Sequence, residues 1–203
     1  MNTQNHVVTR WLLRFFLGSF LLATLLLVSC GDDPEPPNEE ELITTLTITL
    51  TPTEGDPLTM TFKDLDGDGA GVPQFIYSSG GNAAVLASST TYTATLTLMN
   101  ESIAPAENIT EEIEEEADEH LLCFENTGLS GLVINYADTE ADYMAGGSSK
   151  VVGLVTTWTT TATTGEGTVT IKLFHQTNGS KTGTCPTSST DTDIEVTFNV
   201  AIQ

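Results

Sequence analysis

The stretch Leu42-Ile43-Thr44-Thr45-Leu46-Thr47-Ile48-Thr49-Leu50 decides the fold class of this chain. From Leu46 onward, apolar residues alternate with threonine at a period of two, the period at which the side chains of a β-strand change faces. Threonine is β-branched and suits the wet face of a pleated sheet. The stretch therefore predicts a strand with one buried and one solvated face.

The same alternation recurs along the rest of the chain. It is clearest in Thr91–Leu98, Val151–Thr159, Gly167–His175 and Ile194–Ile202. Shorter candidate strands are Leu58–Lys63, Gln74–Tyr77, Leu121–Glu125 and Leu132–Tyr136. Clusters of Gly, Asn, Asp and Pro between them signal turns. We therefore predict one all-β domain over residues 42–203, an antiparallel β-sandwich that is immunoglobulin-like in broad architecture.

One segment, Asn108–His120, has a helical period instead. Ile109, Ile113, Ala117 and His120 recur at positions that share one face of a helix. Asn108 suits the N-cap, and acids fill the first turn, where the helix dipole favours them. We expect one short acidic helix here, with self-repulsion among its acids that cations would relieve.

The first residues have the pattern of an export signal. Arg10 and Arg14 precede an apolar run over Phe15–Val28, and Leu27-Val28-Ser29-Cys30 resembles a bacterial lipobox. In signals of that kind the chain is cut before the Cys, which then carries lipids. The alternative is a transmembrane helix, but the run is short for a span of about 20 residues. We expect residues 1–29 to be a lipoprotein signal peptide and Cys30 to be the lipid anchor.

The following segment, residues 30–41, is acidic and rich in proline. Such composition cannot bury a core and predicts a disordered tether. Its start, Cys30-Gly31-Asp32-Asp33, resembles the acidic export signals of Bacteroidota surface lipoproteins, which implies the cell-surface side of the outer membrane. The alternative is a plain linker without an address.

Charge and cysteine content narrow the function further. The formal net charge is −22, and a field this negative repels phosphate backbones, so we expect no nucleic-acid partner. It favours cations and basic partners. In an oxidising compartment the two cysteines after Cys30, Cys123 and Cys185, are expected to form a disulfide, with free thiols or metal ligation as alternatives.

The histidines that follow the predicted signal peptide are His120 and His175. If the end of the strand carrying His175 packs near the helix end, both imidazoles and Glu116 or Glu119 would form a site suited to zinc or copper. The alternative is that His120 interacts with the helix dipole and that His175 is a surface strand end.

A second candidate cation site is the loop Asp64-Leu65-Asp66-Gly67-Asp68-Gly69. Asp64, Asp66 and Asp68 stand at alternate positions, as at the start of a calcium loop. Phe75 occupies the twelfth position, where an EF-hand has its bidentate Glu. The loop therefore predicts calcium only as a partial match, and the alternative is a hairpin turn rich in Asp and Gly.

Motifs of catalysis are missing from the sequence. It contains no Gly-x-Ser-x-Gly, no His-Glu-x-x-His, no Cys-x-x-Cys and no glycine-rich phosphate loop. We therefore expect a binding or structural protein rather than an enzyme.

Taken together, the chain resembles small Bacteroidota lipoproteins encoded beside TonB-dependent receptors. The matching residues are the lipobox at Cys30, Phe62–Gly69, Ile109–His120 and Phe174-His175. The resemblance implies a binding accessory of an outer-membrane transporter that captures divalent metal; the alternative is a structural or adhesive surface lipoprotein without a small ligand. Proteins of this group are sometimes labelled as type 1 periplasmic binding folds, which require βαβ alternation that this sequence does not show.

The anchor is testable directly. Replacing Cys30 with Ala should abolish lipid attachment, because the modified atom is its thiol sulfur. Metabolic labelling with a palmitate analogue measures this, and equal labelling of Cys30→Ala and the wild type would contradict the lipoprotein hypothesis.

Overall fold

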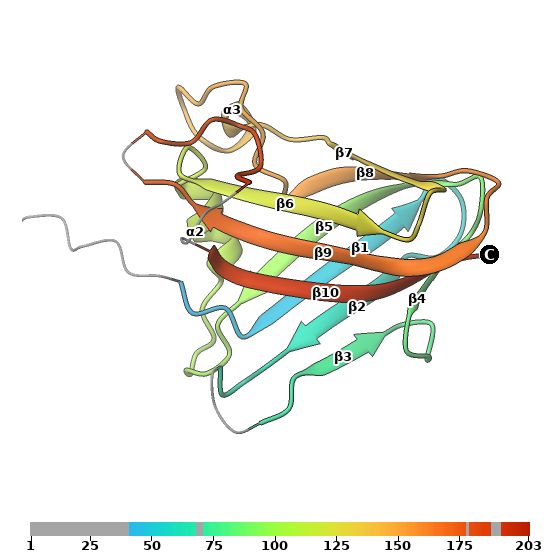
Figure 1. Cartoon of the computed structure of the whole chain (residues 1–203). Coiled ribbons are helices and arrows are strands. Elements are labelled where there is room, and N and C mark those ends of the chain that lie inside the picture. Colours follow the sequence, from blue (N-terminus) through green and yellow to red (C-terminus); the bar gives the residue numbers. More distant parts are fainter. Residues whose placement is uncertain (1–40, 68–70, 178, 188–191) are drawn as a thin grey trace, which may run out of the picture. The chain divides into compact units, whose positions relative to one another are not determined.

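The structure is a computed structural model, and it describes residues 41–67, 71–177, 179–187 and 192–203 (Figure 1). The predicted signal peptide, Cys30 and nearly all of the predicted tether lie outside these residues. The elements are β1 (Thr45–Pro52), β2 (Leu58–Lys63), β3 (Gln74–Tyr77), β4 (Ala84–Leu86), β5 (Thr91–Met99), α2 (Ile109–Glu115), β6 (His120–Thr127), β7 (Leu132–Tyr136), α3 (Glu140–Tyr143), β8 (Val155–Thr160), β9 (Gly165–His175) and β10 (Thr192–Ile202).

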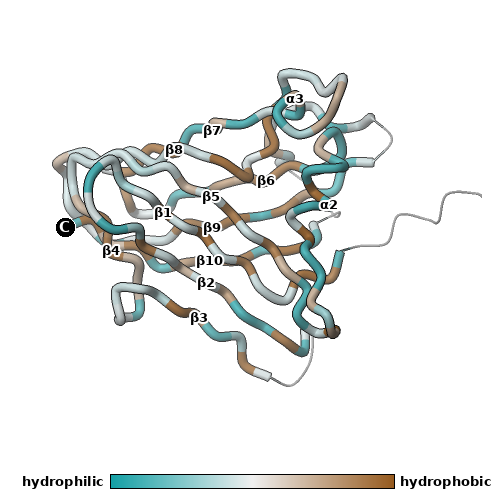
Figure 2. The backbone as a smooth tube through the Cα atoms, turned by 180° about the vertical axis from the view of Figure 1, so that it is seen from behind, coloured by the Kyte–Doolittle hydropathy of each residue, from teal (hydrophilic) through white to brown (hydrophobic). Residues whose placement is uncertain are grey.

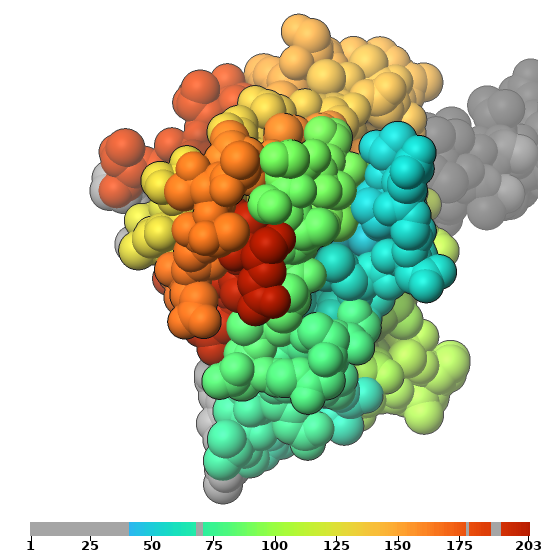
Figure 3. Space-filling model, turned by 90° about the vertical axis from the view of Figure 1, so that its right-hand side faces the viewer, coloured from blue at the N-terminus to red at the C-terminus, as the bar shows by residue number. Residues whose placement is uncertain are grey.

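The strands form two sheets. One has the order β3-β2-β1-β5-β8-β7 and the other β4-β10-β9-β6. The predicted all-β sandwich is thus confirmed, while its immunoglobulin-like character stays a prediction. One feature of the sheets was not predicted, since the short strand β4 pairs with β10 in parallel. As a result, β10 has a neighbour on each side: in Figure 3 the end of β10 (red) lies between β9 (orange) and the green residues that include β4.

The core forms where the alternating strands turn their apolar faces inward. Leu46, Ile48 and Leu50 of β1 are fully buried. Val196 and Phe198 of β10 are buried in the same core. Full burial of each such side chain stabilises the fold by about 1.5–3 kcal/mol. Burial of the apolar residues that recur with a period of two is therefore the main driving force for forming the sandwich.

Threonines follow the outer faces of the strands, as the sequence predicts. The hydroxyls of Thr47 and Thr61 lie 3.0 Å apart between β1 and β2. Those of Thr170 and Thr197 lie 2.8 Å apart between β9 and β10. These cross-strand hydrogen bonds fix the register on the solvated face.

The acidic helix is shorter than predicted. α2 ends at Glu115, residues 116–119 form turns, and His120 begins β6 instead of closing the helix. The predicted apolar face is nevertheless buried, including Ile113 and Ala117. The early end follows from the competing strand pairing, because β6 pairs with β9 from His120 onward. Figure 2 shows the hydrophilic backbone of α2 at one end of the sheets.

The structure brings Cys123 and Cys185 together, with their sulfur atoms 2.16 Å apart in a disulfide. Cys123 lies on the outer face of β6, where it packs with Leu121 and Phe174 in a small second apolar cluster. The bridge therefore fastens the loop after β9 to the outside of the four-stranded sheet.

Replacing both cysteines with serine should lower the free energy of unfolding by about 4 kcal/mol, because a long loop in the unfolded chain is no longer closed. Denaturant unfolding of the double variant and the wild type measures this difference. Mass spectrometry after alkylation without reduction is the companion test, and two reactive thiols at Cys123 and Cys185 in the unreduced wild type would contradict the pairing.

Candidate metal centre

Two histidines face each other at one end of the four-stranded sheet. β6 and β9 pair antiparallel with His120 directly opposite His175. Opposed residues of an antiparallel pair point to the same face of the sheet. The two imidazole rings accordingly stack, with centroids 4.4 Å apart and planes inclined by 24°.

Both rings are inside the protein rather than on its surface. His120 is 0% exposed and His175 is 8% exposed. The alternative of a surface strand end therefore does not describe His175. The helix-dipole alternative for His120 stays a prediction, because its Nδ1 lies 3.2 Å from the carbonyl oxygen of Glu116 at the end of α2. Buried ring nitrogens need hydrogen-bond or ionic partners, and these partners define the site.

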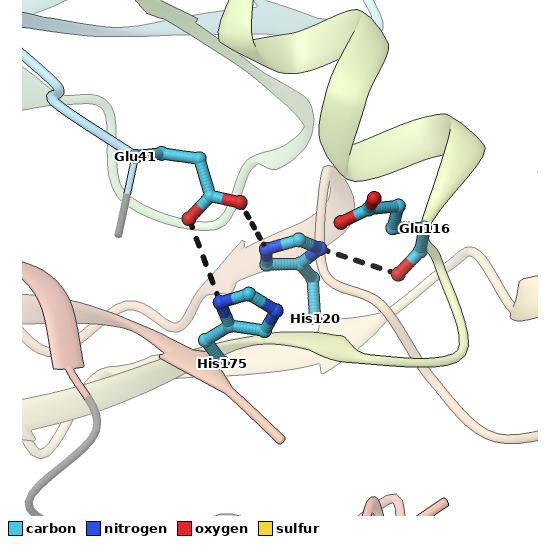
Figure 4. A group of neighbouring side chains, drawn as sticks. All are labelled: Glu41, Glu116, His120 and His175. Atoms are coloured by element: carbon cyan, nitrogen blue, oxygen red, sulfur yellow. Dashed lines mark hydrogen bonds and ion pairs between the residues drawn. The ribbon is translucent and has the colours of Figure 1, made fainter. Parts of the chain in front are cut away.

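The principal partner is Glu41, which comes from the chain just before β1 (Figure 4). Its Oε1 lies 3.1 Å from Nε2 of His120, and its Oε2 lies 3.7 Å from Nδ1 of His175. The Glu41 side chain is only 7% exposed, and Oε2 is buried without a hydrogen-bond partner. One carboxylate thus reaches both imidazoles, and one of its oxygens still lacks a hydrogen-bond donor.

The second nitrogen of His120 is held by backbone. Nδ1 lies 3.2 Å from the carbonyl oxygen of Glu116. Burial by itself would lower the pKa of His120, but the hydrogen bond and charge of Glu41, the charge of Asp193 and the Glu116 carbonyl outweigh it and raise this pKa. In Glu41, burial opposes ionisation, and the hydrogen bond and charge of His120 overcome it to lower the pKa. The pair therefore favours an imidazolium facing a carboxylate when no metal is bound.

His175 is flanked in the same way. Its Nε2 lies 3.6 Å from Oε2 of Glu119, in the turn between α2 and β6. A histidine that binds a metal through one ring nitrogen usually donates its other N–H to a carboxylate or a backbone carbonyl. Nε2 of His120 and Nδ1 of His175 both face Glu41, so these are the two nitrogens that a shared ion would contact.

The arrangement fits a divalent transition metal. One ligand atom from each of Glu41, Glu116, His120 and His175 can be chosen so that all lie within 4.8 Å of one another. We call these four residues the histidine cluster. Two imidazoles with carboxylates are a ligand set that zinc and copper accept, at bond lengths of about 2.0–2.2 Å for zinc. Small side-chain movements would bring these atoms to bonding distance of one ion.

The structure thus gathers His120, His175 and Glu116, as the sequence predicts, and places Glu119 beside the outer nitrogen of His175. Sequence reasoning missed Glu41 because the acidic, proline-rich composition assigned it to the tether. The only signal was its position next to the apolar run that begins at Leu42. The composition of a segment predicts whether the segment as a whole is ordered. It cannot show that the side chain of its last residue, here Glu41, contacts a site in the folded domain.

A buried lysine secures the frame of this site. Nζ of Lys181 donates to the carbonyl oxygen of Ala117 at 2.5 Å and lies 3.2 Å from Oε1 of Glu140. Both charged side chains are almost completely buried. The amide of Gln176 also donates to the carbonyl of Glu119 at 2.7 Å. The loop after His175 is therefore tied to the turn before His120.

The predicted calcium loop connects β2 to β3. Asp64 and Asp66 belong to the described part, whereas Asp68 lies outside it. Oδ2 of Asp66 accepts a hydrogen bond from the amide of Gly71 at 2.8 Å, and this bond is the main reason for its lowered pKa. Asp66 thus closes the loop between β2 and β3, as expected for a hairpin turn rich in Asp and Gly. Calcium binding at this loop stays a prediction.

Comparisons with protein-family models, with curated proteins and with solved structures found no match to this chain. The helices within the described residues are all too short or too polar to cross a membrane.

The ion pair predicts a specific pH dependence in the metal-free protein. Replacing Glu41 with Gln should lower the free energy of unfolding by about 2 kcal/mol, the size of a hydrogen bond to a charged group. The loss should be greatest between pH 4.5 and 6.5, the ordinary pKa values of Glu and His. The contribution of Glu41 fades as pH falls through its lowered pKa, and that of His120 fades as pH rises through its raised pKa.

Denaturant unfolding across a pH series, with a chelator present, measures this difference. Glu54→Gln is the matched control, because it removes the same charge from an exposed side chain. A difference between Glu41→Gln and wild type that did not depend on pH would show that packing, not the ion pair, accounts for the effect.

Proposed function

We propose that this protein is a lipid-anchored outer-membrane protein whose β-sandwich binds a divalent transition metal at the histidine cluster, as a binding accessory of an outer-membrane transporter. The observation that supports metal binding best is the register that sets His120 opposite His175 with Glu41 reaching both rings. The lipid anchor at Cys30 and the association with a TonB-dependent receptor rest on the sequence alone.

The electrostatic surroundings favour a cation at this place. Burial and the negative charges of Glu107, Glu41 and Glu116 raise the pKa of Glu112, which shows that acids crowd around the cluster. Such a field raises the local concentration of cations and speeds their arrival. Crowded carboxylates also lose repulsion when a divalent ion binds among them.

The ligand set favours zinc or copper over calcium. Imidazole nitrogens suit zinc and copper, whereas calcium takes six to eight oxygen ligands. Two of the four residues in the histidine cluster are histidines. We therefore propose zinc or copper as the ion.

A structural or adhesive protein without a small ligand is the second candidate. The observation in its favour is that Glu41 already pairs with His120 at 3.1 Å, so the cluster has a stable metal-free form in which a proton provides the positive charge. In that case the histidines would serve stability only.

Metal titration separates the two candidates. Calorimetry at pH 7.5 on the purified, metal-free protein should show one zinc or copper ion per chain, and binding should raise the thermal midpoint. The double variant His120→Ala/His175→Ala should lose this binding, and copper bound to the wild type should show the visible absorption of nitrogen ligation.

The double variant Glu115→Gln/Asp118→Asn is the matched control. It removes two charges from exposed side chains of the same acidic segment without touching the histidine cluster, so it should bind as the wild type does. If the histidine variant binds as tightly as the wild type, the acids act as a diffuse counterion sink and the proposed metal function is wrong.

A further inference from the structure

Glu41 links the histidine cluster to the chain that enters the six-stranded sheet. Glu41 precedes β1, a strand of the six-stranded sheet. His120 and His175 belong to β6 and β9 of the four-stranded sheet. The cluster therefore joins the chain that enters one sheet to the end of the other sheet.

The chain around Glu41 is attached to the domain in two steps. Thr44 is fully buried and its amide donates to the carbonyl oxygen of Met99 at 3.0 Å, and Ile43 is buried beside it. Leu42 is 51% exposed. Beyond that exposed residue, the Glu41 carboxylate returns to the interior, where its contacts to the two imidazoles hold it.

The Glu41 carboxylate is incompletely satisfied in this position. Oε2 is buried and has no hydrogen-bond partner, and its separation of 3.7 Å from Nδ1 of His175 is too long for a hydrogen bond. A buried carboxylate oxygen without a donor costs free energy that a cation at this position would remove. Oε2 is thus a buried atom at which a cation would be stabilised.

We propose that Glu41 is a ligand of the bound metal and that the ion acts as a clamp, fastening the chain at residues 41–42 to the end of the four-stranded sheet. This inference rests on the proposed metal binding and deepens it. With metal bound, the chain is held against β6 and β9 as far as Glu41. Without metal, it is held only from Ile43 onward, where the buried residues begin.

Hydrogen exchange followed by mass spectrometry tests the clamp on the full purified protein. Within peptides that cover residues 41–46, the fast-exchanging amides should exchange roughly tenfold more slowly when zinc is saturating, because local opening is suppressed. In Glu41→Gln this protection should vanish. Zinc affinity should also fall roughly tenfold or more, as it does when a metal ligand or a residue hydrogen-bonded to a ligand is replaced. Glu41→Asp, which keeps the carboxylate but shortens it, should give an intermediate result.

Glu40→Gln is the matched control, because it removes the neighbouring charge, and it should retain both zinc affinity and protection. Circular dichroism shows whether each variant is folded, and Glu41→Asp replaces Glu41→Gln if the latter is not. If only copper binds, copper replaces zinc in this experiment, and failure of the wild type to bind either ion would overturn the proposed function itself. Zinc binding that depends on His120 and His175 but leaves residues 41–46 unprotected, with Glu41→Gln binding as the wild type, would overturn only the clamp.

Discussion

The antiparallel pairing of β6 with β9 is the constraint on which both the fold and the site depend. It runs from His120 opposite His175 to Thr127 opposite Thr168, and β9 in turn pairs with β10 along its length. Because side chains alternate across a strand, a shift of one residue would move every apolar side chain of β6 to the other face. The same register that buries Leu122 beneath the sheet therefore also stacks the two imidazoles. The pairing that builds the core therefore also brings the two imidazoles of the site together.

Much of this could be predicted from the sequence, since the period of two is a local signal. The bounds of β2, β3 and β7 in the structure are those of the predicted strands. β4 gave no such signal, because its three residues pair in parallel with the distant β10 and depend on that strand for their structure. The helix was predicted in the right place but with the wrong end. Its periodic apolar face continues to Ala117, while the pairing of β6, which depends on residues far along the chain, takes over at His120.

The candidate site shows the same division between local and long-range information. The sequence identified His120 and His175 by elimination, but their meeting depends on a register between segments far apart in the chain. Glu41 could not be found by composition, because its surroundings are acidic and rich in proline up to the residue before Leu42. No pattern in the sequence pointed to Lys181 either. Its buried contacts join the loop after β9 to Ala117, in the turn before His120, and to Glu140 of α3.

The charge balance of the interior connects these features. The histidine cluster contains two carboxylates, so with neutral imidazoles it would hold two negative charges, one of them on the buried Glu41. Isolated buried charge is costly, and it has to be offset by a proton on an imidazole or by a cation. The raised pKa of His120 favours a proton in this role when no metal is present. A divalent ion would replace that proton and also satisfy Oε2 of Glu41, which the proton on His120 leaves without a donor. The same buried carboxylate that favours a proton on His120 in the metal-free cluster therefore also favours a divalent ion, which competes with that proton more effectively as pH rises.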